Sequence, residues 1–292
     1  MPQNAIIRAD GTGDYTTILA WQAGENSADY GSETVGRVDG FFDQGSTSLQ
    51  LTGFVAHGGR LEAFDSSIAF DGTRRSLCGL ITINGTQAVR FGQGNNFTIS
   101  GLEIVYDGGS GTDRALDDRN AFTNTIDDCL VLVTQNCRLA INQFTFNRCV
   151  VVTLATTNAP TNGGQLKFFN CTILGQNASD IVHGSSPATD TVSFNTGTGD
   201  CFAGTTTNCS SSDASADVLI NQTYADTFVS ANPIADEDYR IKPMSFTQSE
   251  GIGAFFAPIS ESDFTRLGSL QVPAGAPSAS SIDLDVRKDD FT

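Results

Sequence analysis

The segment Phe144-Thr145-Phe146-Asn147-Arg148-Cys149-Val150-Val151-Val152 decides the fold, because variants of it recur along the chain. Each copy has strand-forming residues, a short polar pair, a small residue and a second run of strand-forming residues. The other copies span 97–105, 125–133, 168–174 and 192–196. Self-similarity at a fixed period is the sequence signature of a solenoid, in which each repeat adds one coil.

The period is clearest at the small residue that follows the polar pair. Cys129, Cys149 and Cys171 are 20 and 22 residues apart, and Thr196 follows Cys171 by 25. Gly101 precedes Cys129 by 28, because a polar insertion lengthens this coil. Coils of this length, with short strands and tight turns, predict an all-β fold: a single-stranded right-handed parallel β-helix. Its coils stack about 4.8 Å apart.

Equivalent positions of stacked coils form ladders along the axis of such a helix. We expect the three cysteines to form an inward ladder of reduced thiols, because a thiol is small and is stable in an apolar interior. Turn asparagines, whose amides bond backbone groups, are expected to form a second ladder at Asn147, Asn170 and Asn195.

The composition favours strands and turns, since the 292 residues include 30 Gly and many Thr, Ser and Asn. The hydrophobic fraction of 39% is enough for a sizeable core. Lys and Arg total 16 against 33 Asp and Glu, which gives a formal charge of −17. Affinity for a nucleic-acid backbone comes from basic residues that displace counterions, so this charge argues against a nucleic-acid partner.

The seven cysteines are an odd number, and none of them has the CxxC spacing of a zinc or thioredoxin-like site. The chain has no apolar stretch near the roughly 18 residues that a transmembrane helix needs, and its N-terminus lacks the apolar part of a signal peptide. We therefore expect reduced thiols, synthesis in the cytoplasm and no membrane contact.

One convincing helix is predicted, at Tyr15–Gly24. Thr16 is its expected N-cap, Trp21 belongs to an apolar stripe, and Gly24 suits the left-handed position after the last turn. Two turns of helix are marginal in isolation, so we expect this short helix to cap one end of the β-structure.

The end of the chain differs from the rest, because strand periodicity is lost after Ala257 and a stretch rich in Pro and Ser follows. The sequence therefore divides into an N-terminal cap at 1–33, a parallel β-helix at 34–257 and an extended C-terminal arm at 258–292.

Three segments carry a resemblance to known proteins. Gly13-Asp14-Tyr15-Thr16-Thr17 with Ala20-Trp21 is similar to an opening motif, Asn96–Ile104 to a coil consensus, and Asn232–Phe255 to a closing block. Together they resemble the right-handed parallel β-helix (pectate-lyase-like) superfamily, in particular virion-associated β-helix proteins encoded by phages. The resemblance implies the fold over about residues 10–256 and leaves the activity open, because the superfamily includes lyases, glycosidases, tailspikes and decoration proteins.

Enzymes of that superfamily carry carboxylates on one coil face with a basic residue nearby. Neighbouring residues of a strand point to opposite faces, so Asp127 and Asp128 cannot by themselves form a glycosidase pair. Coil stacking brings Asp128 near Arg148, which predicts a surface ion pair across one rung. The remaining acidic and histidine candidates are Asp117, Asp118, Asp180, His183 and Asp190.

The two histidines, His57 and His183, each lie next to Gly in a predicted turn, and no Gly-x-Ser-x-Gly motif accompanies them. Neither zinc-site nor EF-hand spacing is present, although calcium between acidic loops stays open. We therefore expect no catalytic, cofactor-binding or metal-binding residue, and we favour a non-enzymatic role.

The leading functional hypothesis is a structural protein of a bacteriophage virion, a decoration protein of the head. Its expected partners are the capsid or neighbouring copies, contacted through residues 258–292, and a homo-oligomer is compatible with the sequence. The first alternative is a tailspike-like polysaccharide depolymerase or lyase. The second is a non-catalytic glycan-binding protein that uses an exposed Trp21 or Tyr106 to bind surface glycans.

Overall fold

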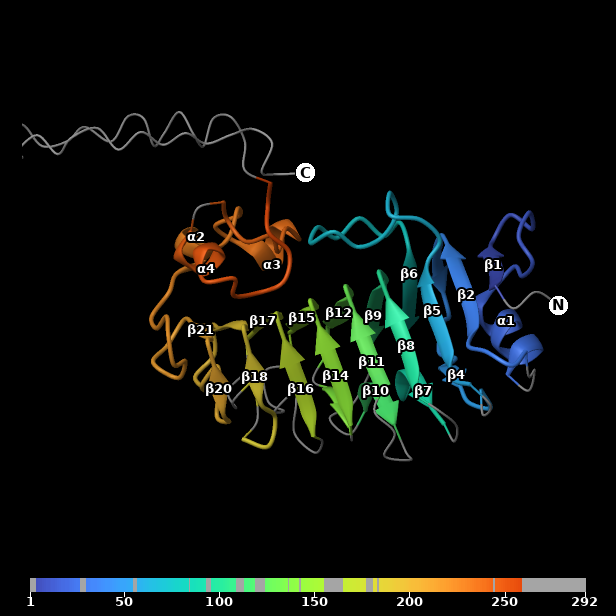
Figure 1. Cartoon of the computed structure of the whole chain (residues 1–292), viewed down its shortest axis with the longest axis horizontal. Coiled ribbons are helices and arrows are strands. Elements are labelled where there is room, and N and C mark those ends of the chain that lie inside the picture. The colour runs from blue at the N-terminus through green and yellow to red at the C-terminus, as the bar shows by residue number, and fades with distance from the viewer. Residues whose placement is uncertain are drawn as a thin grey trace, which may run out of the picture. The chain divides into compact units, whose positions relative to one another are not determined.

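The computed structural model describes residues 4–26, 30–54, 57–83, 85–92, 96–108, 113–118, 124–135, 137–141, 143–154, 165–176, 181–182, 184–243 and 245–258. Short strands pair in parallel and in register, so the predicted all-β parallel β-helix is confirmed (Figure 1). Met1–Ala257 forms a compact unit. The predicted arm lies outside the described residues, except for its first residue, Pro258.

The strands form three parallel sheets, which we call sheets A, B and C. Sheet A contains β1 (Asn4–Arg8), β2 (Thr34–Asp39), β5 (Gly59–Ala63), β8 (Phe97–Ser100), β11 (Asn124–Asp127), β14 (Phe144–Asn147), β16 (Leu166–Phe169), β18 (Ala188–Thr189) and β20 (Thr206–Thr207). Sheet B contains β3 (Phe41–Asp43), β6 (Gly79–Ile83), β9 (Glu103–Asp107), β12 (Leu130–Val133), β15 (Val150–Thr153), β17 (Thr172–Gly175), β19 (Val192–Asn195) and β21 (Ser210–Ser211). Sheet C contains β4 (Leu49–Leu51), β7 (Gln87–Phe91), β10 (Arg114–Asp118) and β13 (Arg138–Ile141).

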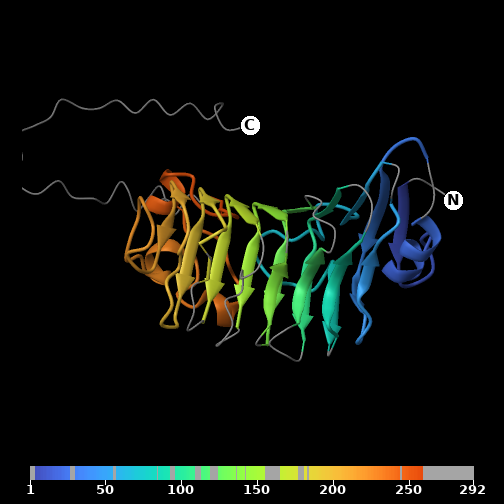
Figure 2. The same cartoon turned by 90° about the horizontal axis from the view of Figure 1, so that it is seen from below.

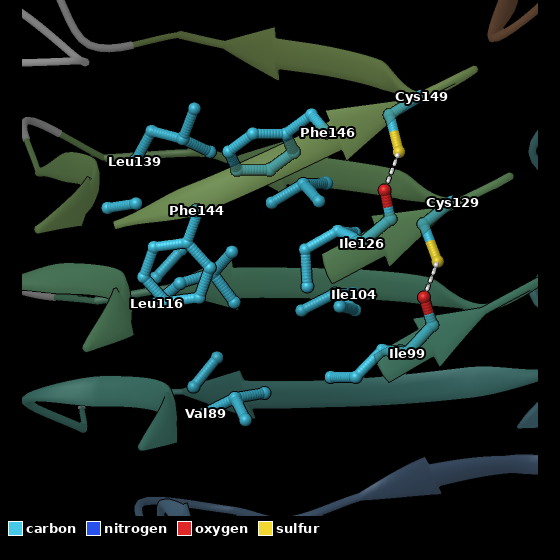
Figure 3. Packing of buried hydrophobic residues seen from close by; sticks show 14 of the residues in the cluster. Val89, Ile99, Ile104, Leu116, Ile126, Cys129, Leu139, Phe144, Phe146 and Cys149 are labelled. Carbon is cyan, nitrogen blue, oxygen red and sulfur yellow. Dashed lines mark hydrogen bonds between the residues drawn. The ribbon is translucent and has the colours of Figure 1, made fainter. Parts of the chain in front are cut away.

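Sheet A strands alternate between buried and exposed side chains, as expected for a sheet with one face on the core. In β14, Phe144 and Phe146 point inward, whereas Thr145 and Asn147 point outward. Phe146 stacks on Phe168 of the next coil with ring centroids 5.1 Å apart. Figure 3 shows this interior from close by.

Sheet B strands are buried on both faces, and their sequences are correspondingly apolar throughout, as in Leu130–Val133 and Val150–Thr153. Val131 and Val151 point into the solenoid, whereas Leu130 and Val150 belong to a second core on the outer face. The segment 224–257 covers this outer face and contains the short helices α2 (Tyr224–Thr227), α3 (Pro233–Asp236) and α4 (Phe246–Ser249) (Figure 1).

The covering segment is attached by aromatic and polar contacts. Phe194 of β19 stacks on Tyr224 at 4.9 Å and meets Phe228 edge-on at 5.4 Å. The backbone N–H of Ala254 donates to Thr172 Oγ1 at 3.1 Å. Sheet B is therefore an internal layer, and sheet A keeps an exposed outer face.

A two-residue bend joins sheet A to sheet B in each coil from β8 onward. Its first residue has a positive φ, close to 50° in the non-glycine cases. Asp and Asn adopt this left-handed conformation more readily than most residues, and Gly adopts it freely. These first residues are Gly101, Asp128, Arg148, Asn170, Asp190 and Asn208.

The structure of this bend shows that two predictions from the sequence are wrong. The residue that follows Cys171 along the ladder is Thr191, not Thr196, because Val192 pairs with Thr172 directly after the bend. The predicted asparagine ladder is wrong: Asn170 lies in the bend, whereas Asn147 and Asn195 end strands of different sheets. The true turn ladder mixes Gly, Asp, Arg and Asn, since its requirement is a backbone conformation.

The predicted N-terminal helix is confirmed as α1 (Ile18–Glu25), which lies at one end of the coil stack (Figures 1 and 2). The N-cap is Thr17 instead of Thr16, since Thr17 Oγ1 accepts the N–H of Ala20 at 3.0 Å. Gly24 lies inside the helix, where a Cβ would come within 2.7 Å of the Tyr15 hydroxyl. It is therefore required for close packing and not for ending the helix.

At each end of the solenoid the chain itself pairs with one outermost strand, β1 of sheet A and β21 of sheet B. At the N-terminal end, residues 14 and 15 pair with β1, and Asp14 Oδ2 accepts the N–H of Ile6 at 2.8 Å. At the C-terminal end, Leu219 pairs with β21 through Ser210, and the N–H of Ser211 donates to its carbonyl at 2.8 Å. Such cover prevents strand pairing with other molecules.

Phe146 provides a test of the predicted inward and outward faces. Phe146→Ala should lower the free energy of unfolding by about 3 to 5 kcal/mol, because the fully buried ring leaves a cavity between coils. Thr145→Ala, one residue away on the outer face, should change it by no more than about 0.5 kcal/mol. Urea denaturation followed by circular dichroism measures both, and equal losses would contradict the assignment of faces.

Candidate functional site

The predicted thiol ladder is confirmed. Cys129 and Cys149 lie at the second residue of successive A–B bends, and each thiol donates to a carbonyl of the preceding coil (Figure 3). The Cys149 Sγ lies 3.1 Å from the carbonyl of Ile126, and the Cys171 Sγ lies 3.4 Å from that of Phe146. The ladder continues through the Thr191 hydroxyl, which accepts the N–H of Cys171 at 3.3 Å, to Cys209.

The ladder is structural, because burial suppresses ionisation of its thiols. All seven cysteines are buried, and none of them forms a disulfide. Burial raises the pKa of Cys129 and of Cys149 well above the ordinary value, and it raises that of Cys209 to about 11. Since the thiolate is the reactive form, these positions are poor nucleophiles and poor metal ligands.

A thiol titration checks this assignment. The folded protein at pH 8 should react negligibly with a chromogenic disulfide reagent, whereas seven thiols should react after denaturation in guanidinium. Thr145→Cys, which places a thiol on the exposed face of sheet A, should add one rapidly reacting group and serves as the control. Rapid reaction of the folded wild-type chain would contradict a buried ladder.

The carboxylates of Asp127 and Asp128 point to different places, as their adjacent positions predicted. Asp127 Oδ1 accepts the side-chain amide of Asn147 at 2.8 Å. Asp128 lies in the bend and forms a two-pronged ion pair with Arg148, with both N–O distances 2.7 Å. The predicted pair with Arg148 is therefore confirmed, and both members are exposed. An exposed pair of this kind contributes at most about 1 kcal/mol.

Within the described residues, the other acidic and histidine candidates from the sequence form no common site with Asp127 and Asp128. Asp117 and Asp118 are buried in β10, and Asp117 Oδ1 lies 3.8 Å from Arg114 Nη1. Asp190 lies in the bend and accepts the amide of Asn208 at 2.6 Å. His57 lies in an exposed turn. Asp180 and His183 lie outside the described residues.

A charged cluster missed by the sequence analysis joins the loop before β6 to the covering segment. Glu103 is almost fully buried on the outer face of sheet B and accepts the N–H groups of Arg75 and Ser76 at 2.9 and 3.0 Å. Arg74 lies 4.0 Å from Glu103 and forms an ion pair with Glu237. Burial raises the pKa of Glu103, although the two N–H groups and Arg74 lower it. The cluster ties distant segments together, with Glu103 buried and Glu237 at the surface.

Two further carboxylates close the C-terminal end of the solenoid. Asp213 Oδ2 accepts the N–H of Cys201 at 2.7 Å, and Asp217 accepts those of Asn208 and Cys209, each at 2.8 Å. Burial acts to raise the pKa of Asp213, but the bonds from Ser215 and Cys201 outweigh burial, so its pKa is lowered overall. The ionised carboxylate is thus the form that stabilises this end.

Asp213→Ala should lower the free energy of unfolding at pH 7 by about 1 to 2 kcal/mol, because the partly buried N–H groups of Cys201 and Ser215 lose their acceptor. The lowered pKa means that this contribution is complete above the ordinary Asp pKa of about 4 and is lost as pH falls through the lower folded value. The difference from wild type should therefore shrink at pH 3. Asp10→Ala is the control for the size of the loss, because Asp10 is exposed and accepts from Thr12 in its own turn, so its removal should cost less at pH 7. An equal deficit at both pH values would count against the ionised carboxylate.

In the described part of the chain, no group of three His, Cys, Asp or Glu side chains could hold a metal ion. None of the helices in the same residues is long and apolar enough to cross a bilayer. The glycan-binding residues named from the sequence are wrong, because Trp21 and Tyr106 are fully buried. Trp21 stacks on Phe54 beneath α1, and the Tyr106 hydroxyl donates to the carbonyl of Gly85.

The outer face of sheet A forms a regular, partly exposed surface. Two rows of side chains run along it at the inter-strand spacing of about 4.8 Å. The first row consists of Asn4, Val35, Arg60, Thr98, Thr125, Thr145 and Lys167. The second row consists of Ile6, Arg37, Glu62, Ser100, Asp127, Asn147, Phe169, Thr189 and Thr207. We call these two rows the sheet A face.

The centre of the sheet A face carries short side chains, and its end at β2 and β5 carries paired charges. Arg37 pairs with Glu62 at 3.1 Å, and Arg60 pairs with Glu33 at 3.2 Å. Short side chains lose little conformational entropy on binding, which suits a contact surface. The sequence signal was present, because Thr98, Thr125 and Thr145 each precede an inward apolar residue and a second polar one.

Comparison with known proteins adds no identification: no family model, no curated protein and no solved structure matches the chain.

Proposed function

We propose that the chain is a structural protein of a bacteriophage particle, which decorates the head exterior and acts through protein contacts. The observation that carries this proposal is that the polar side chains have two separate roles, one inside the fold and one on the sheet A face. Asp128 links neighbouring coils, Asp213 closes the C-terminal end of the solenoid, and Glu103 binds the loop before β6. The sheet A face, in contrast, presents a long regular surface. A flat array of short side chains suits a contact with another protein, whereas small-molecule and catalytic sites are concave.

The resemblance of the three sequence segments to phage β-helix proteins supports the same proposal. Each segment has a definite structural role: 13–21 leads into and forms part of α1, 96–104 contains β8 and the start of β9, and 232–255 covers sheet B. The charge of −17 suits an outer surface better than one that faces packaged DNA. The arm at 258–292 is the proposed anchor to the capsid or to neighbouring copies.

Mass spectrometry of purified phage particles tests the proposal. The chain should be present in stoichiometric amount. A phage in which this chain is truncated to residues 1–257 should yield particles that lack the truncated protein. Circular dichroism of the recombinant 1–257 fragment is the control for folding, since Met1–Ala257 is a compact unit. Absence of the wild-type chain from particles would refute the structural role, and full occupancy of the truncated form would refute anchoring by the arm. Cleavage of capsular or other polysaccharides by the purified chain would instead favour the depolymerase alternative.

A further inference from the structure

The segment that covers sheet B carries several exposed apolar side chains close to the start of the arm. In the part of the chain that the structure describes, seven large hydrophobic side chains are exposed. Three of them, Val229, Phe246 and Phe256, lie in the segment 224–257, and Phe246 is the most exposed at 77%. Scattered exposed apolar residues are ordinary, whereas several in one place indicate a contact surface.

Two of these side chains lie on paired segments from which the arm leaves. Ile241 pairs with Phe256, and the N–H of Ala257 donates to the Ile241 carbonyl at 3.0 Å. The N–H of Val229 donates to the carbonyl of Arg240, also at 3.0 Å. Val229 and Phe256 therefore flank the same central segment, immediately before the first residue of the arm.

Phe246 lies on the loop that joins two of these paired segments. The loop leaves Ile241, contains α4 and returns to Phe256, so both of its ends are fixed where the arm begins (Figure 1). Ser245 is the N-cap of α4, and its Oγ accepts the N–H of Gln248 at 3.1 Å. Phe246 is thus presented to solvent from an ordered helical turn.

The same loop is attached to the A–B bends of the solenoid. The side-chain amide of Asn170 donates to the carbonyl of Gly251 at 3.3 Å, and that of Asn208 donates to the carbonyl of Glu250 at 3.2 Å. Since these bonds hold the backbone of the loop in place, Phe246 can contact a partner with little ordering of the chain. Low ordering cost leaves more of the contact free energy for binding.

These bonds also place the loop beside the sheet A face. Phe169, which is 38% exposed in the second row, immediately precedes Asn170. Val229, Phe246, Phe256 and Phe169 therefore surround one loop, and we call them the arm-root surface. Three of the four are aromatic, a residue class that is enriched in protein interfaces.

The occupant of the arm-root surface follows from the position of the arm. Residues 258–292 continue directly from this surface, since Phe256 lies two residues before Pro258. A partner that binds the arm is therefore held next to the arm-root surface at a high effective concentration. A second contact with the same partner then increases the total affinity without any further ordering of the fold.

We propose that the arm-root surface docks on an apolar patch of the same shell protein of the particle that holds the arm. This inference rests on the proposed function, because it takes the particle shell as the partner. It adds a second contact, made by the folded body, to the anchor formed by the arm.

Retention of variants on particles tests this contact. Phe246→Ser, in the full chain with its arm intact, should dissociate from diluted particles at least about tenfold faster than wild type, because one of two linked contacts is lost. Its thermal unfolding, followed by circular dichroism, should match wild type, since the exposed ring buries little surface. Leu77→Ser is the matched control, because Leu77 is 42% exposed in the loop before β6 and should dissociate at the wild-type rate.

The outcomes separate this contact from the proposed function. If wild type is present on particles and Phe246→Ser dissociates no faster, the inference fails and the structural role stands. Equal acceleration by Leu77→Ser would also overturn it. Absence of wild type from particles refutes the proposed function and this contact together. Sedimentation velocity tests a different occupant: a wild-type dimer that Phe246→Ser makes monomeric would assign the surface to a second copy and overturn docking on the shell.

Discussion

The two-residue bend between sheets A and B is the constraint on which the other features depend. Its first residue turns the chain with a positive φ, and the N–H of that residue bonds the carbonyl that ends the adjacent strand of the next coil, as Asp128 does with Asn147. From Cys129 onward, its second residue places a thiol or hydroxyl against the preceding coil. Because the bend has constant length, strand register on both sides is fixed, and the rows on the sheet A face follow from it.

Sheet B shows how the same bend creates a need for cover. The residues after the bend are apolar on both faces, as in Leu130–Val133, so one face enters the solenoid and the other must be shielded. The segment 224–257 provides that shield and is attached through Phe194 and Thr172. The shield leaves sheet A as the exposed side of the molecule.

Much of this architecture follows from the sequence because it is periodic. The cysteine spacing and the pair of Asp128 with Arg148 depend only on coil length, so counting residues predicts them. The position of Thr191 in the thiol ladder could not be predicted from the cysteine spacing. Polar insertions outside the bend change the number of residues between successive ladder positions, although the bend itself has constant length. The cover over sheet B and the burial of Trp21 and Tyr106 depend on contacts between remote segments, which no local pattern specifies, although the unbroken apolar runs of β12 and β15 indicated that cover was needed.

The closed ends give the solenoid a defined length. A stack of similar coils has no intrinsic stopping point, since each coil offers the next one the same parallel edge. Here that edge is occupied by Asp14 and Tyr15 at one end and by Asp213, Asp217 and Leu219 at the other. The repeat therefore sets the cross-section of the molecule, and the terminal segments set the number of coils. The difference between filament growth and finite assembly therefore lies in a few residues at the two ends of the coil stack.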